Sequence, residues 1–326
     1  MAARAHHGKA ASKRERTLNY ALSIVIIVLV IYILYSQNVL QSLGIAKAQP
    51  LGNTTAGIDQ QFSSSELSTI NSAPNSNFET AGEMLLNGSL YGMVFYPNRT
   101  TAGAPVTPFM VNGKPSVIYV GAISCIYCGE NRWAMALALS RFGKFGNLYI
   151  GYSSIGDGDV PTIYWSKLNY TTTAGVSYGN SYSSNYINFI SAEFESPIKG
   201  GFQMAPLSYL VSRAPNQTYY SAMSLMNDTG RFQGTPFTLW GSVLAPGADA
   251  IVFGNTTPTS NNLPLTHMTH TQVLNQIASF NDQFAYAEYA AADVYASYVC
   301  PSINNSAPIC ALPAIKALIA RENLTA

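Results

Sequence analysis

The sequence of 326 residues has little charge and few cysteines. Charged residues make up 10% of the chain, against about 25% in a typical soluble protein. The formal net charge is +1, and without a long basic block the chain lacks the positive surface on which nucleic-acid binding depends. Four cysteines are too few for a disulfide-dense scaffold, although they suffice for one redox or metal motif and one structural bridge. Hydrophobic residues make up 48% of the chain, which excludes global disorder and provides for a large core.

A basic segment followed by a long apolar run opens the chain. Residues 1–17 hold five Lys and Arg against one Glu, and residues 18–35 carry no charge. As a helix this run would be about 27 Å long, close to the thickness of a bilayer core. We therefore expect a cytoplasmic tail over 1–17, a single transmembrane anchor over 18–36, and the rest of the chain outside the membrane. A signal peptide cleaved after Ala48 is the alternative, but that site lies far from the apolar run.

An excess of Asn-x-Ser/Thr sequons supports the exterior location. The sequence holds nine of them, where chance alone would give roughly four. The candidate glycosylation sites are Asn53, Asn87, Asn98, Asn169, Asn216, Asn227, Asn255, Asn304 and Asn323. Few ionisable groups would also suit an acidic exterior, where carboxylates are protonated and ion pairs are lost.

The chain beyond the anchor divides into a predicted stalk and a predicted domain. Residues 37–83 are rich in Ser, Asn, Gln and Thr without a lasting apolar period, which is typical of a flexible stalk. Residues 84–326 are predicted to fold. Within them, an apolar run over 117–122 predicts a buried strand, and the segment from Cys125 to Phe142 predicts a helix.

Further strands and helices follow. Residues 147–153 predict a strand that would complete a βαβ unit with parallel strands. Residues 154–234 are predicted to form an insertion. The other expected elements are strands at 163–165 and 186–194, a short helix within 206–228, a hairpin of 237–243 and 250–253 with its turn at Pro246-Gly247, and helices at 271–280, 282–299 and 311–321.

The strongest chemical motif is Cys125-Ile126-Tyr127-Cys128, placed after a strand and at the start of a helix. The free N–H groups and the dipole of a helix start stabilise a thiolate, so Cys125 is predicted to be the attacking nucleophile. The spacing lets Cys128 attack a mixed disulfide and release the product. Glu130 is a candidate for proton transfer, or else a solvated carboxylate of the first helical turn.

Pro236 fits the same chemistry. Gly234-Thr235-Pro236 precedes a predicted strand, and thioredoxin-like folds place a cis-proline there, opposite the two cysteines. The order of strand, CxxC, helix, x-Pro, strand, strand and helix predicts an α/β fold with a thioredoxin-like central sheet and flanking helices. The predicted catalytic residues are Cys125, Cys128 and Pro236.

Other interpretations of the cysteines remain open. Cys125 and Cys128 could form a static disulfide. They could instead supply two ligands of a zinc site completed by His267 and His270, or form a copper site with His267 near Met268. Neither metal site is favoured, and no organic cofactor or metal is predicted. Cys300 and Cys310 enclose a short loop between two helices, and outside the membrane a structural disulfide is expected.

The central block resembles a known family. The similar segments are Gly113-Lys114-Pro115, Tyr119-Val120-Gly121-Ala122, the CxxC motif, Arg132-Trp133, and Ala138 to Gly143. They are similar to an archaeal and actinobacterial family known as domain of unknown function 929, and the resemblance extends from about Met84 to Leu312. It implies a membrane-anchored thioredoxin-like domain and assigns no activity.

The sequence therefore predicts a membrane-anchored, extracytoplasmic thiol–disulfide oxidoreductase. Its expected partners are membrane lipid, through the N-terminal helix, and extracytoplasmic proteins with cysteine pairs, but no nucleic acid. A non-catalytic, glycosylated surface or complex-associated protein on the same scaffold is the first alternative, and a copper chaperone is the second. The direction of electron transfer stays open, because Ile126 stands where the family usually has a proline after the first cysteine.

Overall fold

The computed structural model describes residues 57–94, 106–153, 159–168, 175–195, 205–246, 265 and 268–322. The predicted tail and anchor, residues 1–36, lie outside them. Among the residues described, no helix has the length and apolar character needed to cross a bilayer.

The core of the domain is a mixed β-sheet, which makes the protein an α/β protein. Its strands follow the order β10-β9-β2-β8-β6, and β1 pairs with β2 off this path. β2 runs parallel to β8 and antiparallel to β9, while β6 and β10 are antiparallel to their neighbours. The bounds are β1 Met110–Val111, β2 Lys114–Ala122, β6 Gly175–Tyr178, β8 Asn188–Glu195, β9 Phe237–Trp240 and β10 Val243–Pro246.

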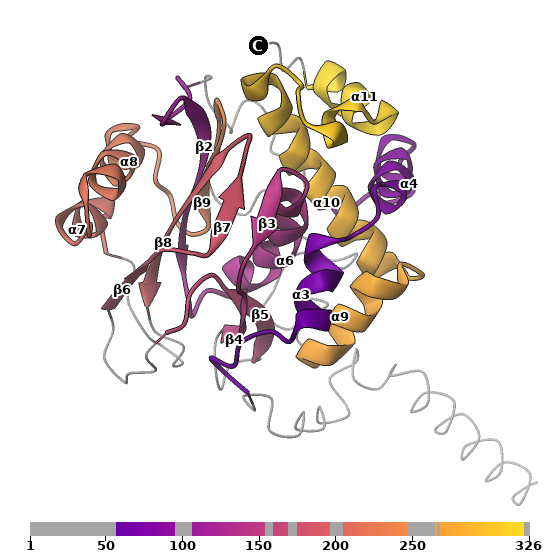
Figure 1. Cartoon of the computed structure of the whole chain (residues 1–326), viewed down its shortest axis with the longest axis horizontal. Coiled ribbons are helices and arrows are strands. Elements are labelled where there is room, and N and C mark those ends of the chain that lie inside the picture. The colour runs from indigo at the N-terminus through magenta and orange to yellow at the C-terminus, as the bar shows by residue number, and fades with distance from the viewer. Residues whose placement is uncertain are drawn as a thin grey trace, which may run out of the picture. The chain divides into compact units, whose positions relative to one another are not determined.

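Helices cover both faces of this sheet. Because side chains alternate along a strand, Val117 and Tyr119 of β2 pack into one apolar cluster while Ile118 and Val120 pack into another. The first cluster joins the sheet to α6 (Ile126–Ser140) and α10 (Gln283–Val299), and the second joins it to α7 (Leu207–Ser212) and α8 (Gln217–Asp228). Figure 1 shows α7 and α8 on one side of the sheet and α6 and α10 on the other.

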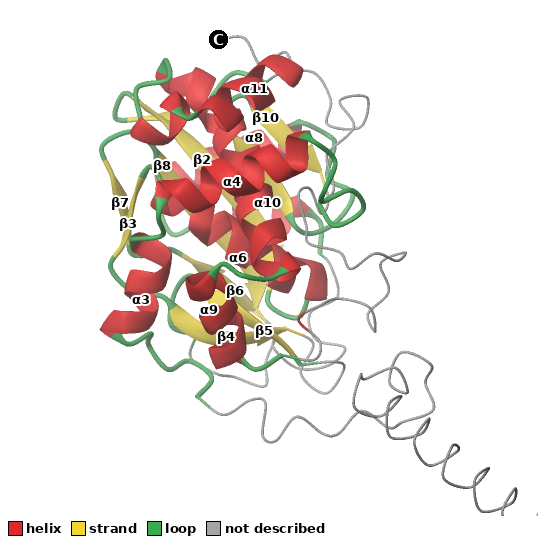
Figure 2. Ribbon diagram, turned by 90° about the vertical axis from the view of Figure 1, so that its right-hand side faces the viewer, coloured by secondary structure: helices red, strands yellow, loops and turns green. Residues whose placement is uncertain are grey.

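The two helices of the first layer are almost entirely buried. Alanines recur along α6 and α10, which pack against each other, and the Tyr295 hydroxyl of α10 hydrogen-bonds to Asn131 of α6. In the perpendicular view of Figure 2, α10 and α4 (Asn75–Leu86) lie in front of the strands. α6 therefore lies between the sheet and an outer layer of helices, and its first residue follows Cys125.

The predicted stalk is wrong for residues 57–83. Ser63 and Glu66 form a reciprocal capping box that starts α3 (Ser64–Asn71). Ile70 of α3 and Phe78 of α4 are fully buried, and α4 packs against α10 and α11 (Pro313–Arg321). The apolar residues are few in this polar segment, but they are spaced to reach one core. The rest of the predicted stalk lies outside the described residues.

The predicted parallel pairing after the first helix is also wrong. β4 (Tyr149–Ser153) pairs antiparallel with β5 (Val160–Tyr164) in a separate two-stranded sheet. The parallel partner of β2 is β8. Residues 154–234 are consequently not an insertion, because they contain two strands of the central sheet. They also hold α7, α8 and β7 (Tyr182–Ser184), which pairs with β3 (Gly143–Phe145).

The hairpin at the sheet edge has a different turn from the one predicted. β9 and β10 are joined by Gly241 and Ser242, with Val243 opposite Trp240. Gly241 has φ +59°, in the left-handed region that tight hairpin turns require and that glycine adopts freely. Residues 250–253, predicted as the second strand, lie outside the described residues.

The C-terminal part agrees with the sequence prediction. α9 (His270–Ser279), α10 and α11 occupy the three predicted helical segments within a few residues. Cys300 and Cys310 form the predicted disulfide, with their Cα atoms 5.6 Å apart. The bridge closes the loop that leads from α10 to α11.

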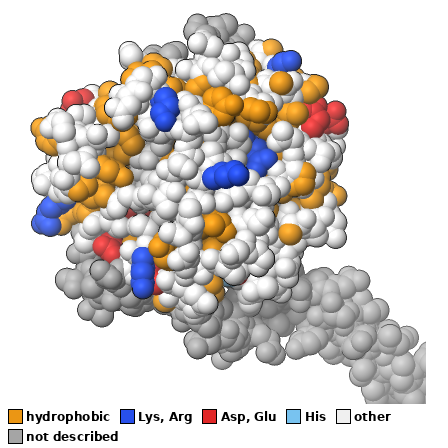
Figure 3. Space-filling model, in the orientation of Figure 1, with side chains coloured by type: hydrophobic (Ala, Val, Ile, Leu, Met, Phe, Trp, Pro, Cys, Tyr) orange, Lys and Arg blue, Asp and Glu red, His pale blue; other side chains and the backbone are white. Residues whose placement is uncertain are grey.

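Charged side chains are sparse on the face shown in Figure 3. Within the described residues, four predicted glycosylation sites, Asn87, Asn216, Asn227 and Asn304, are exposed. The other five, Asn53, Asn98, Asn169, Asn255 and Asn323, lie outside them.

Candidate active site

Cys125 occupies the N-cap position of α6. Its backbone is extended, and its sulfur accepts a hydrogen bond from the backbone N–H of Cys128 at 3.3 Å. This uses one of the free amides of the first helical turn. The thiol is half-buried, so the sulfur lies at the edge of the fold while its hydrogen bonds are already in place.

Cys128 lies one turn further along the helix and is fully buried. Hydrogen bonding to Cys128 lowers the pKa of Cys125 to about 7 despite burial, and a side-chain hydrogen bond with Thr235 and the charge of Arg132 act in the same direction. Burial raises the pKa of Cys128 well above its usual value, and its hydrogen bond to Cys125 adds to this. The two thiols thus differ as a nucleophile and a resolving cysteine must differ.

The predicted proline loop faces Cys125. The Thr235–Pro236 peptide bond is cis, and the Cys125 thiol donates to the Thr235 carbonyl at 3.4 Å. Residues 110 positions apart therefore meet because β2 and β9 are neighbouring strands. The structure brings together all three predicted catalytic residues, Cys125, Cys128 and Pro236.

A buried ion pair lies beside the two cysteines, and sequence reasoning missed it. Arg132 of α6 donates to both carboxylate oxygens of Glu193, on β8, at 3.1 and 2.6 Å. Both side chains are buried. Arg132 stands out in the sequence as a charge in an apolar helix, and Glu193 as an acid within an apolar strand, but nothing in the sequence pairs them.

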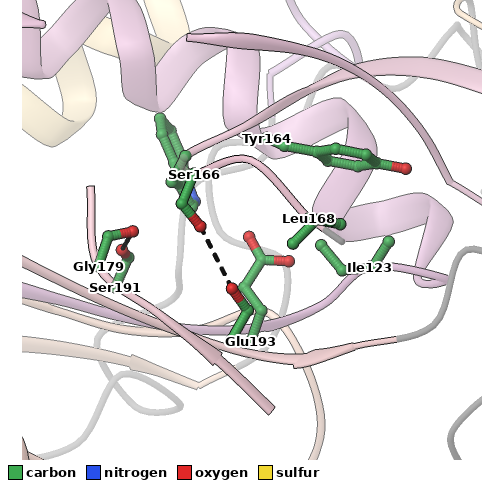
Figure 4. A pocket seen from close by; sticks show the side chains of 9 residues that line it. Ile123, Tyr164, Ser166, Leu168, Gly179, Ser191 and Glu193 are labelled. Carbon is green, nitrogen blue, oxygen red and sulfur yellow. Dashed lines mark hydrogen bonds between the residues drawn. The ribbon is translucent and has the colours of Figure 1, made fainter. Parts of the chain in front are cut away.

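Glu193 also lines a small cavity of about 10 Å³, room for a single water molecule. Figure 4 shows its carboxylate directed among Ser166, Leu168 and Ile123. The hydroxyl groups of Ser166 and Ser177 lie within hydrogen-bonding distance in the same cavity. On its Glu193 side the ion pair therefore borders a cavity lined by both hydroxyl-bearing and apolar side chains.

Glu130 is not the solvated carboxylate that one interpretation expected. It is buried, and one of its oxygens accepts the backbone N–H of Leu265 at 3.3 Å. Burial raises the pKa of Glu130 well above its usual value, which favours the protonated carboxyl. Its role in proton transfer remains a prediction.

The metal interpretations gain no support from the described residues, which contain no cluster of three or more His, Cys, Asp or Glu arranged to hold a metal. His270 is buried, with its ring 5.1 Å from that of Trp133 and 5.0 Å from that of Phe62. His267, on which the copper interpretation depends, lies outside the described residues.

Together these observations define the class: an α/β protein in which a CxxC pair opens a buried helix on a mixed sheet, opposite a cis-proline loop. The chain belongs to the domain of unknown function 929 family, whose profile matches residues 104–301. That match covers β1 to α10 and contains every residue of the candidate site. No curated protein and no solved structure matched the chain.

Proposed function

We propose that this protein is a thiol–disulfide oxidoreductase with a thioredoxin-like fold, anchored in the membrane and acting outside it. The observation that carries the proposal is the environment of Cys125. The Cys125 thiol is half-buried at a helix start, has a lowered pKa and contacts the Thr235 carbonyl. The neighbouring Cys128 thiol is buried and has a raised pKa. An inert cysteine bridge needs none of these features.

The thioredoxin-like assignment is supported by the order of elements along the chain. β2 leads into the CxxC and α6, and Thr235–Pro236 leads into the hairpin of β9 and β10, which is followed by α9 and α10. The central sheet places β9 beside β2, so both active segments lie at the same end of neighbouring strands. The membrane anchor and the exterior location are supported by the apolar run at 18–35 and by the sequons.

The proposed reaction is thiol–disulfide exchange. The Cys125 thiolate attacks one sulfur of a substrate disulfide, which breaks the substrate S–S bond, forms a mixed disulfide and releases one substrate thiolate. Cys128 then loses its proton and attacks the Cys125 sulfur. This releases the second substrate thiolate and leaves a Cys125–Cys128 disulfide, so two electrons pass to the substrate. The reverse sequence oxidises a substrate dithiol.

Substrates would be extracytoplasmic proteins with cysteine pairs. We expect an extended peptide to pair with the backbone beside Pro236, because the Thr235 carbonyl lies 3.4 Å from the Cys125 sulfur and brings this backbone next to the attacking thiol. The chemistry requires no organic cofactor, because both electrons are held by the two cysteines.

A trapping experiment tests this function. The full-length Cys128→Ser variant is incubated with a disulfide-bonded peptide, and adducts are identified by mass spectrometry. The serine hydroxyl can still donate to Cys125, but it cannot resolve the mixed disulfide. We expect a stable adduct at Cys125 in this variant and none in the matched Cys125→Ser variant. Absence of an adduct in both would favour the non-catalytic surface protein.

A further inference from the structure

The Arg132–Glu193 ion pair is the most unusual feature next to the cysteines. In the described residues it is the one ion pair between buried side chains. Burying two charges is costly, and replacing such a pair with apolar residues often leaves stability unchanged or raises it. Because the ion pair lies beside the thiols, we consider a role in their chemistry in addition to stability.

The geometry joins Arg132 to Cys125 through one carbonyl group. Arg132 lies four residues after Cys128, on the same face of α6. Its Nη2 donates to the Ala122 carbonyl oxygen at 3.1 Å, and the backbone N–H of Cys125 donates to that same oxygen, also at 3.1 Å. Arg132 thus holds the backbone turn that presents Cys125.

The charge of Arg132 is fixed in place. Glu193 binds the guanidinium through both oxygens, and the Ser153 hydroxyl accepts from Nη1 at 3.3 Å. The guanidinium carbon lies 5.8 Å from the centre of the Tyr119 ring. A guanidinium keeps its charge even when buried, so a permanent positive group lies beneath the CxxC.

We propose that Arg132 and Glu193 are positioning residues that set the redox equilibrium of Cys125 and Cys128. In the proposed exchange, on which this inference rests, Arg132 stabilises the thiolate of the reduced pair and thereby favours the dithiol form. Glu193 fixes the guanidinium and offsets part of its charge, which moderates this effect. The positive charge of Arg132 lowers the pKa of both thiols, which supports the assignment.

The two partners should act in opposite directions. Arg132→Gln removes the positive charge and should raise the pKa of Cys125 by about one unit. A neighbouring charge typically shifts a pKa by about one to three units, and this is the lower end of that range. A rise of one unit moves the redox equilibrium towards the disulfide form by about twofold at pH 7, where only part of Cys125 is thiolate, and by up to tenfold at pH values above both pKa values. Glu193→Gln keeps the hydrogen-bonding shape and leaves Arg132 uncompensated, so the thiolate gains stability and the equilibrium moves towards the dithiol.

The test uses full-length protein and two readouts. The pH dependence of Cys125 alkylation by iodoacetamide gives its pKa, and equilibration in glutathione buffers gives the redox equilibrium constant. Arg141→Gln is the matched control. Arg141 follows the last residue of α6 and donates a hydrogen bond to the backbone carbonyl of Asn71. We expect the Arg141→Gln variant to change neither readout.

A single variant that fails to fold does not end the test. Arg132→Gln/Glu193→Gln removes both charges together and leaves no uncompensated charge in the core. We expect it to behave like Arg132→Gln, because a buried Glu193 without its partner is protonated. Shifts in the same direction for both single variants, or an unchanged double variant, would overturn the proposal. Failure of the wild type to exchange with glutathione would instead overturn the proposed function, while the alkylation profiles would still report on Arg132.

Discussion

Three buried carboxylic acids predict that the domain loses stability as the pH rises. Glu130 of α6 and Glu288 and Asp293 of α10 are buried, and five of their six carboxyl oxygens have no hydrogen-bond partner. Burial raises the pKa of each well above its usual value. Glu130 adds to this shift for Glu288, and Glu79 adds to it for Asp293. The folded protein therefore holds three protons that the unfolded chain releases above about pH 4.5.

The pH dependence of the free energy of unfolding follows from the number of these protons. Each excess proton on the folded state lowers the free energy of unfolding by about 1.4 kcal/mol per pH unit. His270 opposes the acids, because burial lowers its pKa to about 4 and the unfolded chain binds the extra proton below about pH 6.5. Three acids less one histidine leave two protons, or about 2.7 kcal/mol per pH unit between pH 4.5 and 6.5. Burial also raises the pKa of Glu193, Glu195 and Asp59, and these groups act in the same direction as the three acids.

Denaturant unfolding of the domain at several pH values and constant ionic strength measures this slope. Stability should fall steadily from pH 4.5 to 6.5. Glu288→Gln keeps the side-chain shape without a titrating group, and it should reduce the slope by about 1.4 kcal/mol per pH unit. A flat or rising stability over this range would refute the reasoning. The predicted preference for acid fits the low charge of the sequence and the acidic exterior that it favours.

Two further predictions concern structure around the site. The Cys300→Ser/Cys310→Ser variant should lose about 2–3 kcal/mol of unfolding free energy, as expected for a loop of this length, with no change in the alkylation profile of Cys125. A changed profile would show that the bridge is coupled to the CxxC. Gly129→Ala should lower the thermal midpoint, because the added Cβ would lie 2.9 Å from the Ser153 hydroxyl and 3.1 Å from Val160. An unchanged midpoint, measured by circular dichroism, would show that β4 and β5 move aside.

Local patterns were sufficient to predict the elements that carry the candidate site. The apolar run before Cys125 predicted β2, and the unbroken helix formers after it predicted α6, because both signals lie within a few neighbouring residues. The order of motifs also placed Pro236 opposite the cysteines. That prediction needed only the assumption that the two strands are neighbours, which β2 and β9 are.

Pairings between distant residues could not be predicted in this way. The strand at 147–153 looked like the natural partner of β2, but the parallel partner β8 lies further along the chain. Arg132 and Glu193 are 61 residues apart, and a lone charge in an apolar segment does not identify its partner. The helices within 57–83 are hard to predict because their few core residues, such as Ile70 and Phe78, stand among Ser and Asn.

The reduction potential of the Cys125–Cys128 pair tests the central claim most directly. The protein is equilibrated in glutathione buffers, and the state of each cysteine is read by alkylation and peptide mass spectrometry. A working oxidoreductase should give a potential between about −120 and −270 mV, with Cys125 alkylated first. A pair that stays oxidised below about −300 mV would be a structural disulfide and would contradict the account.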